Sequence, residues 1–337
     1  ARALAEQLGD GLAQVELLVA ESAVCDFLQR YGEAGELAEE AARRAPPGLP
    51  PPLRARLANW LGVARFHQHR DAEALELLGL AIALGGALAD HESEVGAALI
   101  AGHAYLRLGR LADGLALLDR VIARCQAAGD YFHLACAHSN RVVVWRELGR
   151  PERATADLEA VVAIARDFGF ALLEAAGLAN LAEHLCWLGR LDDALAASGA
   201  AHQQSVRRFR DQPLAIVSLY HAQLLALAGR DDEVRRTLAE LGAVELTEPS
   251  IAIMYDAVTL ALAGPDACWA ALHARATDLA GGLQPVEMLW LEGRRALGHG
   301  DAARAADRLA RAQALAAPTA PELAAAIARD LARLPST

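Results

Sequence analysis

The chain has 337 residues, a formal net charge of −11 at neutral pH and 54% hydrophobic residues, of which few are aromatic. Every basic residue is arginine, and the longest basic run, Arg207-Arg208-Phe209-Arg210, is typical of a helix C-terminus, where cations offset the helix dipole. Nucleic-acid-binding domains usually carry a basic stripe, so the acidic balance argues against direct binding to DNA or to an anionic membrane. The cysteines are scattered and form no Cys-x-x-Cys pair, which predicts reduced thiols and a cytoplasmic location. The chain has no uncharged apolar run of about 18 residues, so no membrane span is expected.

The N-terminal part of the chain predicts an atypical repeat over residues 1–45. Residues 4–30 place apolar side chains at helical spacing and predict one or two helices. Tyr31-Gly32-Glu33 interrupts this pattern, and a short helix is expected from Glu36 to Arg44. Residues 46–52 are rich in proline, which favours extended structure, and predict a stiff connector rather than a peptide ligand for an SH3-like partner.

Between residues 53 and 242 one turn motif returns every 40 residues. Leu108-Gly109-Arg110 recurs as Leu148-Gly149-Arg150 and Leu188-Gly189-Arg190, with variants at residues 68–70 and 228–230. Glycine can close a helix in the left-handed conformation, and the acidic residues after each turn favour the start of the next helix. A period of this size indicates stacked helical hairpins. The expected helix pairs are 53–66 with 71–84, 95–108 with 111–127, 132–148 with 151–166, 172–188 with 191–206, and 214–228 with 231–241.

The spacing loosens over residues 243–337. Two further hairpins are expected there, 249–262 with 267–279 and 286–297 with 302–315. A last helix at 321–334 is expected to cap the array, because a terminal repeat must present one face to water. We expect the whole of residues 1–337 to form a single solenoid. Because the chain begins at Ala1 rather than Met, we also expect it to be a region of a longer protein.

Small residues recur at two places in each block. Seven residues before the turn are Gly62, Gly102, Val142, Ala182 and Ala222, and five after it are Ala74, Gly114, Ala154, Ala194 and Val234. Large apolar residues follow one helical turn later at Leu78, Leu118, Leu158 and Leu238. This order of small and large residues resembles the tetratricopeptide repeat over about residues 52–242. HEAT and armadillo repeats have periods of similar length, but the order of the small residues favours the tetratricopeptide repeat over them. The period of 40 exceeds the usual ~34. The aromatic residue of the first helix is kept as Tyr105 and Trp145 but is Leu185 in the next block.

The resemblance implies an all-α fold: an α-solenoid, coiled as a right-handed superhelix of about eight helix-turn-helix repeats. Repeats of this length resemble the C-terminal helical arrays of large bacterial signalling proteins, which include MalT-like and LuxR-type activators and ATPase- or kinase-linked regulators. The implied function is a non-catalytic scaffold that binds a protein or peptide, as the regulatory or sensor part of a larger protein. The alternative is a sensory domain whose superhelix changes shape when a small effector binds. A long open trough would favour the first and a closed pocket with a few convergent polar groups the second.

The resemblance also implies that the first helix of each hairpin lines a concave groove. Asn140 and Asn180 occupy equivalent positions there, and their amides could hold an extended peptide backbone or could fix helix stacking instead. Trp145, Trp187, Trp60 and Tyr105 could form a ligand-stacking surface or belong to the core. Trp145 and Tyr105 are expected in the core, and Trp187 is the one of the four that is expected to be partly exposed. The groove positions are Arg56, Asn59, Phe66, Leu99, His103, Arg107, Ser139, Asn140, Val143, Arg146, Asn180, Glu183, Trp187, Tyr220 and Gln223.

The sequence carries no signature of catalysis, of a cofactor or of a metal site. It has no phosphate-binding Gly-x-x-x-x-Gly-Lys motif, no Gly-x-Ser-x-Gly and no His-Glu-x-x-His. Acid pairs such as Asp192-Asp193 stand at helix starts, where the helix dipole explains them. His67 and His69 lie at a turn, and His133, Cys136 and His138 do not share one helix face cleanly. We therefore expect no enzyme activity, and a partner protein or peptide in the groove.

Overall fold

The computed structural model describes residues 9–208, 211–242, 246, 248–264, 267–278 and 283–334. These residues form 17 helices and no strand, which confirms the predicted all-α fold. The chain divides into two compact units, residues 1–157 and 158–337. That one solenoid runs through both units stays a prediction. None of the helices in the described ranges is long and apolar enough to cross a membrane.

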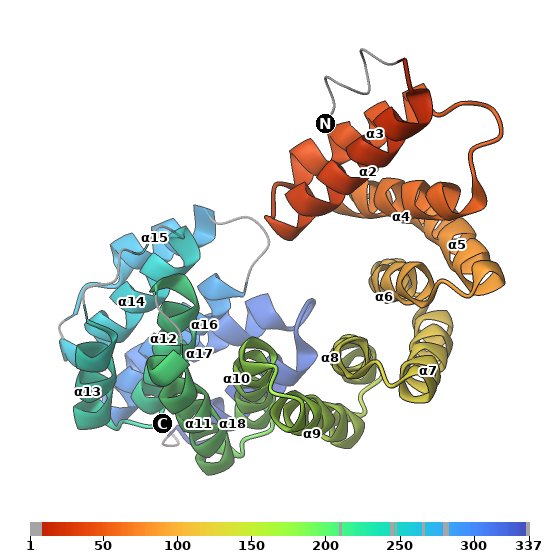
Figure 1. The fold of residues 1–337 in the computed structure, drawn as a ribbon. Helices are drawn as coiled ribbons and strands as arrows, with labels where there is room; N and C mark the ends of the chain where they lie inside the picture. The colour runs from red at the N-terminus through yellow and green to blue at the C-terminus, as the bar shows by residue number, and fades with distance from the viewer. Residues whose placement is uncertain are drawn as a thin grey trace. The chain divides into compact units, whose positions relative to one another are not determined.

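Unit 1 consists of helical hairpins that follow one another along the chain (Figure 1). The first helices of successive hairpins also pack side by side, α2 on α4, α4 on α6 and α6 on α8. The predicted helix pairs are confirmed to within a few residues. The helices are α2 (Gly11–Phe27), α3 (Tyr31–Arg44), α4 (Pro51–His67), α5 (Asp71–Leu88), α6 (His91–Arg107), α7 (Leu111–Ala128), α8 (Tyr131–Glu147) and the first part of α9 (Pro151–Asp167).

Unit 2 holds the remaining hairpins and a final helix, and its last helices lie against its first ones. Helix α16 packs on α12, and α18 packs on α10 (Figure 1). The bounds are α10 (Ala171–Trp187), α11 (Leu191–Arg208), α12 (Asp211–Leu227), α13 (Asp231–Leu241), α14 (Pro249–Leu262), α15 (Ala270–Asp278), α16 (Gln284–Gly298), α17 (Ala302–Ala316) and α18 (Pro321–Leu331). Arg207 and Arg208 end α11, as predicted, whereas Phe209 and Arg210 lie outside the described residues.

The turn inside each regular hairpin is a Schellman turn. The arginine N–H donates to the carbonyl five residues earlier, at 2.8 Å for Arg110 to Tyr105 and 2.9 Å for Arg190 to Leu185. The residue before the arginine has a positive φ, which is 70° at Gly109. This geometry is why glycine recurs there, since it adopts positive φ without steric cost.

The first break in the chain lies earlier than predicted. Helix α3 begins at Tyr31, so the expected interruption at residues 31–33 is wrong. The break is the turn around Gln29, whose φ is 60°, and Arg30 donates to the Cys25 carbonyl at 2.8 Å. Arg30 stands one period of 40 before Arg70. The 40-residue spacing of the turns therefore extends one hairpin further towards the N-terminus. The sequence does not show this turn as a Gly-Arg motif, because glutamine replaces the glycine.

The recurring arginine has a local partner in most hairpins. It forms an ion pair with the acidic residue three positions later, as in Arg110–Asp113 at 2.8 Å and Arg190–Asp193 at 2.7 Å. Equivalent pairs are Arg30–Glu33, Arg70–Glu73 and Arg230–Glu233. These side chains are largely exposed, so each pair contributes only about 0.3–0.5 kcal/mol. We therefore interpret the arginine and the acidic residue as parts of the turn structure and not as ligand-binding residues.

Small residues let the two helices of a hairpin approach closely. A Cβ atom added to Gly62 would lie 2.7 Å from Cγ of the fully buried Leu78. The same contact recurs between α16 and α17, where a Cβ on Gly293 would lie 2.8 Å from Cγ of Leu309. Gly293 also stands seven residues before the turn glycine, Gly300. The looser C-terminal part therefore contains a hairpin with the regular packing.

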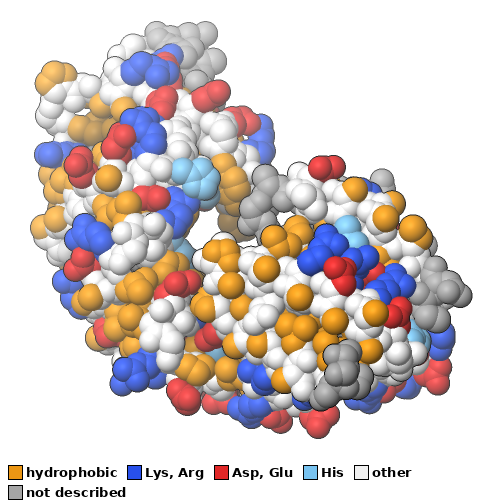
Figure 2. Space-filling model, turned by 180° about the vertical axis from the view of Figure 1, so that it is seen from behind, with side chains coloured by type: hydrophobic (Ala, Val, Ile, Leu, Met, Phe, Trp, Pro, Cys, Tyr) orange, Lys and Arg blue, Asp and Glu red, His pale blue; other side chains and the backbone are white. Residues whose placement is uncertain are grey.

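Charges are mixed over the surface that Figure 2 shows. Arginine side chains lie among acidic and hydrophobic ones, and they form no basic stripe on that face.

Candidate functional site

Asn59, His103 and Asn140 lie on the first helices of three successive hairpins of unit 1. We call the side of α4, α6 and α8 that carries them the A-helix face. All three side chains are half-buried. Asn140 donates to the Leu99 carbonyl at 3.2 Å and also hydrogen-bonds to His103, so it ties α8 to α6. Burial lowers the pKa of His103, which keeps its ring neutral at pH 7.

Asn59 differs from the other two because part of its side chain is unsatisfied. Its Oδ1 atom is buried and has no hydrogen-bond partner among the described residues. A buried acceptor without a donor costs about 1–3 kcal/mol. Asn59 occupies the position that Leu99 and Ser139 hold in the next two hairpins. This point of the A-helix face therefore gains most from a donor that a ligand brings.

Two of the predicted groove arginines are bound within unit 1. The Arg107 guanidinium stacks 3.6 Å from the centre of the Phe66 ring, and it donates to the Phe66 carbonyl at 2.5 Å and to Asp71 at 2.9 Å. Arg56 pairs with Glu16 at 3.1 Å. Both arginines thus connect one hairpin to the preceding one. Ser139 and Arg146 are half-buried on α8.

A buried carboxylate lies where α8 meets α9. Asp157 is 4% exposed and accepts hydrogen bonds from Arg141 at 2.6 and 2.8 Å and from the Trp145 indole at 2.9 Å, and it also bonds to His138 at 2.7 Å. Burial alone would raise the pKa of Asp157, but the bonds from Arg141 and His138 outweigh it and hold the pKa below its usual value. Trp145 is 7% exposed, which confirms its predicted place in the core.

The equivalent helix face of unit 2 is covered in part. Trp187 is 8% exposed and Gln223 is 4% exposed, so the prediction that Trp187 is partly exposed is wrong. The cause is α18, from which Arg329 donates to the Trp187 carbonyl. Asn180 is exposed and Tyr220 is half-buried. The predicted groove residues of unit 2 therefore include core residues of that unit.

Two predicted groove residues meet a carboxyl group that the sequence did not single out. Glu287 on α16 hydrogen-bonds to Gln223 on α12 and lies near Glu183 on α10. Burial, together with the charge of Glu183, raises the pKa of Glu287 to about 7. The only sequence signal is an acidic residue within the apolar run of α16.

Unit 2 also contains a charged cleft of about 420 Å³ between the α12–α13 turn, α16 and the end of α18. It is lined by Arg294, Arg295 and Arg333 and by Asp231 and Asp330. Arg295 binds Asp231 through two bonds of 2.8 Å, and Arg294 binds Asp330 at 2.8 Å. The Nε atom of Arg295 is buried and has no partner in the described part of the chain. None of the predicted site residues lines this cleft.

One group in unit 1 has the composition of a metal site. A ring nitrogen of His91, the thiol of Cys125 and a carboxylate oxygen of Asp130 lie within 4.8 Å of one another. His133 is not part of this group but hydrogen-bonds to Asp130, whereas His138 hydrogen-bonds to Asp157. The sequence did not reveal this group, because His91 stands almost a full period before Asp130.

No family model and no curated protein matches this chain. Solved structures do match. A Rap protein superposes with a TM-score of 0.58 at 12% identity, over 99% of this chain and 82% of that one. The apo form of the quorum sensor NprR from B. thuringiensis gives 0.56 at 12% identity, over 98% of this chain and 91% of that one. A signal-transduction ATPase from Pyrococcus horikoshii with a tetratricopeptide repeat sensor gives 0.58 at 14% identity, over 95% of this chain but 44% of that one. The fold is that of a tetratricopeptide-like helical repeat array, as the sequence predicted.

Proposed function

We propose that this chain is a non-catalytic sensor that binds an extended peptide on the A-helix face of unit 1. The observation that carries the proposal is the buried, unpartnered Oδ1 of Asn59 on a half-exposed polar face. An extended peptide presents backbone N–H groups along its length, and one of them can supply the missing donor. His103 and Asn140 then form a preorganised polar surface beside it, which lowers the cost of ordering on binding.

The structural neighbours support this proposal at the level of the fold. A Rap conjugation regulator of the plasmid pLS20 was solved in complex with the Phr* peptide, and it superposes with a TM-score of 0.53 at 15% identity. The ATPase from P. horikoshii uses such an array as a sensor within a longer protein. We propose the same arrangement for this chain. A cytoplasmic location fits it, since all five cysteines are free thiols.

The test is a selection of peptides from a random displayed library, followed by fluorescence anisotropy with a labelled selected peptide. We expect Asn59→Ala to weaken binding tenfold or more. Asn180→Ala, which removes an exposed amide in unit 2, serves as the matched control and should bind as wild type. Equal affinity of Asn59→Ala and wild type would place the peptide elsewhere, and a selection that enriches no peptide would refute the function.

A second candidate function is the binding of a small anionic effector in the charged cleft of unit 2. Its volume of about 420 Å³ lies within the usual ~300–1,000 Å³ of ligand pockets, and Arg295 Nε lacks a partner there. A thermal-shift screen of small carboxylates and phosphates tests it. Arg333→Gln should abolish the shift, whereas Arg311→Gln, which removes an exposed arginine of α17, should keep it. The absence of any shift with wild type would remove this candidate.

A further inference from the structure

The turn between α7 and α8 brings a thiol and a carboxylate together. Asp130 N–H donates to the Cys125 carbonyl at 3.0 Å, and Gly129 has a φ of 69° between them. Asp130 is also the N-cap of α8, and its Oδ1 accepts the His133 N–H at 3.1 Å. Two local constraints, a helix end and a helix start, therefore fix the positions of Cys125 and Asp130.

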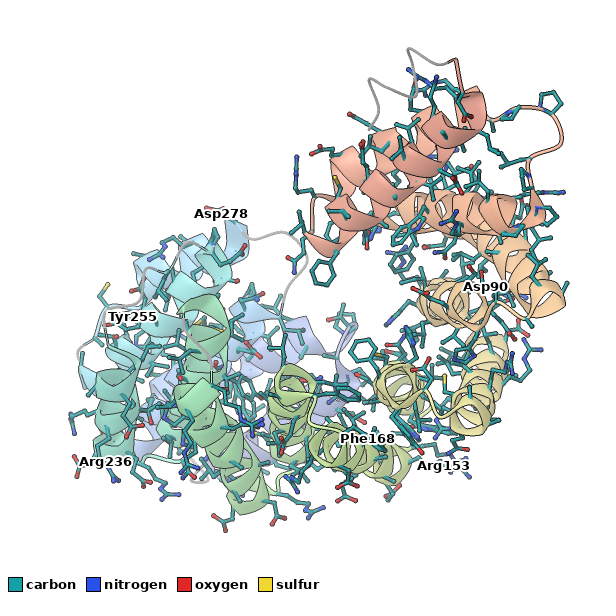
Figure 3. The ribbon with its side chains drawn as sticks, in the orientation of Figure 1. Asp90, Arg153, Phe168, Arg236, Tyr255 and Asp278 are labelled. Carbon is teal, nitrogen blue, oxygen red and sulfur yellow. The ribbon has the colours of Figure 1, made fainter. Side chains whose placement is uncertain are left out.

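The neighbouring helix adds a histidine to this pair. His91 is the first residue of α6, next to Asp90, which Figure 3 labels. Its Nε2 lies 2.8 Å from Oδ2 of Asp130, and Nδ1 of His133 lies 2.7 Å from the same oxygen. One carboxylate oxygen thus stands between two imidazole rings.

The distances suit a tetrahedral metal ion. Metal–ligand bonds of about 2.0–2.3 Å place the ligand atoms of tetrahedral zinc roughly 3.3–3.8 Å apart. The ligand atoms of His91, Cys125 and Asp130 lie within 4.8 Å of one another, and His91 Nε2 lies 2.8 Å from Oδ2 of Asp130. The group is therefore compact enough for one ion to reach all three residues.

One ring nitrogen of the group has no partner. His91 Nδ1 is buried and makes no hydrogen bond within the described residues, whereas Nε2 of the same ring bonds to Asp130. Cys125 is fully buried, and its thiol belongs to the same compact group as Asp130. A divalent cation balances one thiolate and one carboxylate, and it favours the thiolate because metal binding displaces the thiol proton to solvent.

We propose that His91, Cys125 and Asp130 bind one zinc ion, which links α6, α7 and the start of α8 at the junction between two hairpins of unit 1. A donor set of one sulfur, one imidazole nitrogen and one carboxylate oxygen is of the kind that zinc takes. Magnesium and calcium prefer sites made of oxygen atoms alone. The ion acts as a cross-link between repeats, on a different group of residues from the proposed peptide surface.

Titration of the chelator-treated chain with Co²⁺, a spectroscopic substitute for zinc, tests the site. We expect a thiolate-to-cobalt absorption band that saturates at one equivalent, that zinc displaces and that magnesium leaves unchanged. Cys125→Ser should abolish the band. Cys25→Ser, which alters another buried thiol of unit 1, is the matched control and should keep it. A band that survives in Cys125→Ser, or no band in the wild type, overturns the proposal.

Two more variants separate metal binding from folding. Asparagine caps helices as well as aspartate does, so Asp130→Asn should keep the start of α8 while Co²⁺ affinity falls tenfold or more. His91→Gln should lower the affinity by a similar factor and decides the question if Cys125→Ser fails to fold. Wild-type affinity in both folded variants would show that the cluster is only a hydrogen-bond network.

Discussion

The first helices of the hairpins serve different purposes in the two units. In unit 1 the side chains of Asn59 and His103 are half-exposed on the A-helix face. In unit 2 the position equivalent to His103 is Gln223 on α12, which is 4% exposed because α16 packs on that helix. At this position the repeat therefore gives a surface on α6 and a core on α12. What decides between them is whether later helices of the chain return to cover the face.

Replacing the buried aspartates should lower the free energy of unfolding more than any other change. It also tests which contacts hold α18 against α10. Asp330 on α18 accepts bonds from the Trp290 indole at 2.7 Å and from Arg294 at 2.8 Å, much as Asp157 holds Trp145 and Arg141 in unit 1. Asp330→Ala leaves a largely buried guanidinium unpaired, which costs about 3–5 kcal/mol. Urea unfolding gives the free energy, and hydrogen exchange of residues 180–188 should rise because α18 loosens.

Asp157→Ala completes this comparison. It should lower the stability by a similar amount and leave exchange of residues 180–188 at the wild-type rate, because its partners lie in unit 1. Asp119→Ala is the control, since it removes only the exposed partner of Arg141 and should change stability by less than about 0.5 kcal/mol. Equal exchange in the two aspartate variants would contradict the role assigned to Asp330.

Close helix approach is the feature that the two units share. Gly62→Ala and Gly293→Ala each place a methyl group against a buried leucine, and each should cost about 1–3 kcal/mol. Gly79→Ala has open space around its new methyl group and should stabilise α5 by roughly 0.5–1 kcal/mol. Thermal denaturation measures all three. A neutral Gly293→Ala would show that the α16–α17 hairpin does not pack like the regular ones.

These shared features are the ones that the sequence predicts well. The turn glycines and the small residues act between residues close in the chain, so their spacing predicted the helix pairs. The covered part of unit 2 depends on α16 and α18, which begin at residues 284 and 321, far along the chain from α10, and lie outside the 40-residue period. Trp187 and Gln223 were misplaced for that reason. Likewise, the grouping of His91 with Asp130 arises from packing between hairpins, and no local spacing records it.

The stability of unit 2 should also depend on pH through two carboxyl groups of α16. The pKa of Glu287 is raised to about 7, so its favourable contribution is present below its unfolded value near 4.5 and is lost as pH rises towards 7. Burial would raise the pKa of Glu292, but bonds from His273, Arg304 and Arg308 lower it to about 2, so its contribution is lost only as pH falls from about 4.5.

Wild type should therefore lose about 1–2 kcal/mol of unfolding free energy between pH 5 and pH 7 through Glu287. Glu287→Gln should remove this loss, and urea unfolding at several pH values measures it. Glu292→Gln should keep the loss and flatten the decline at acid pH instead. An unchanged slope in Glu287→Gln would mean that Glu287 is ionised in the folded protein throughout this range.

The smallest expected effect concerns the two equivalent asparagines. Asn140 bonds to the Leu99 carbonyl and to His103, so Asn140→Ala should cost about 1 kcal/mol and lower the melting temperature by a few degrees. Asn180 is exposed, and Asn180→Ala should change stability by less than about 0.5 kcal/mol. Differential scanning calorimetry of both variants resolves the difference. Equal melting temperatures would mean that Asn140 does not hold α8 to α6, and its amide would then be available to a peptide on the A-helix face.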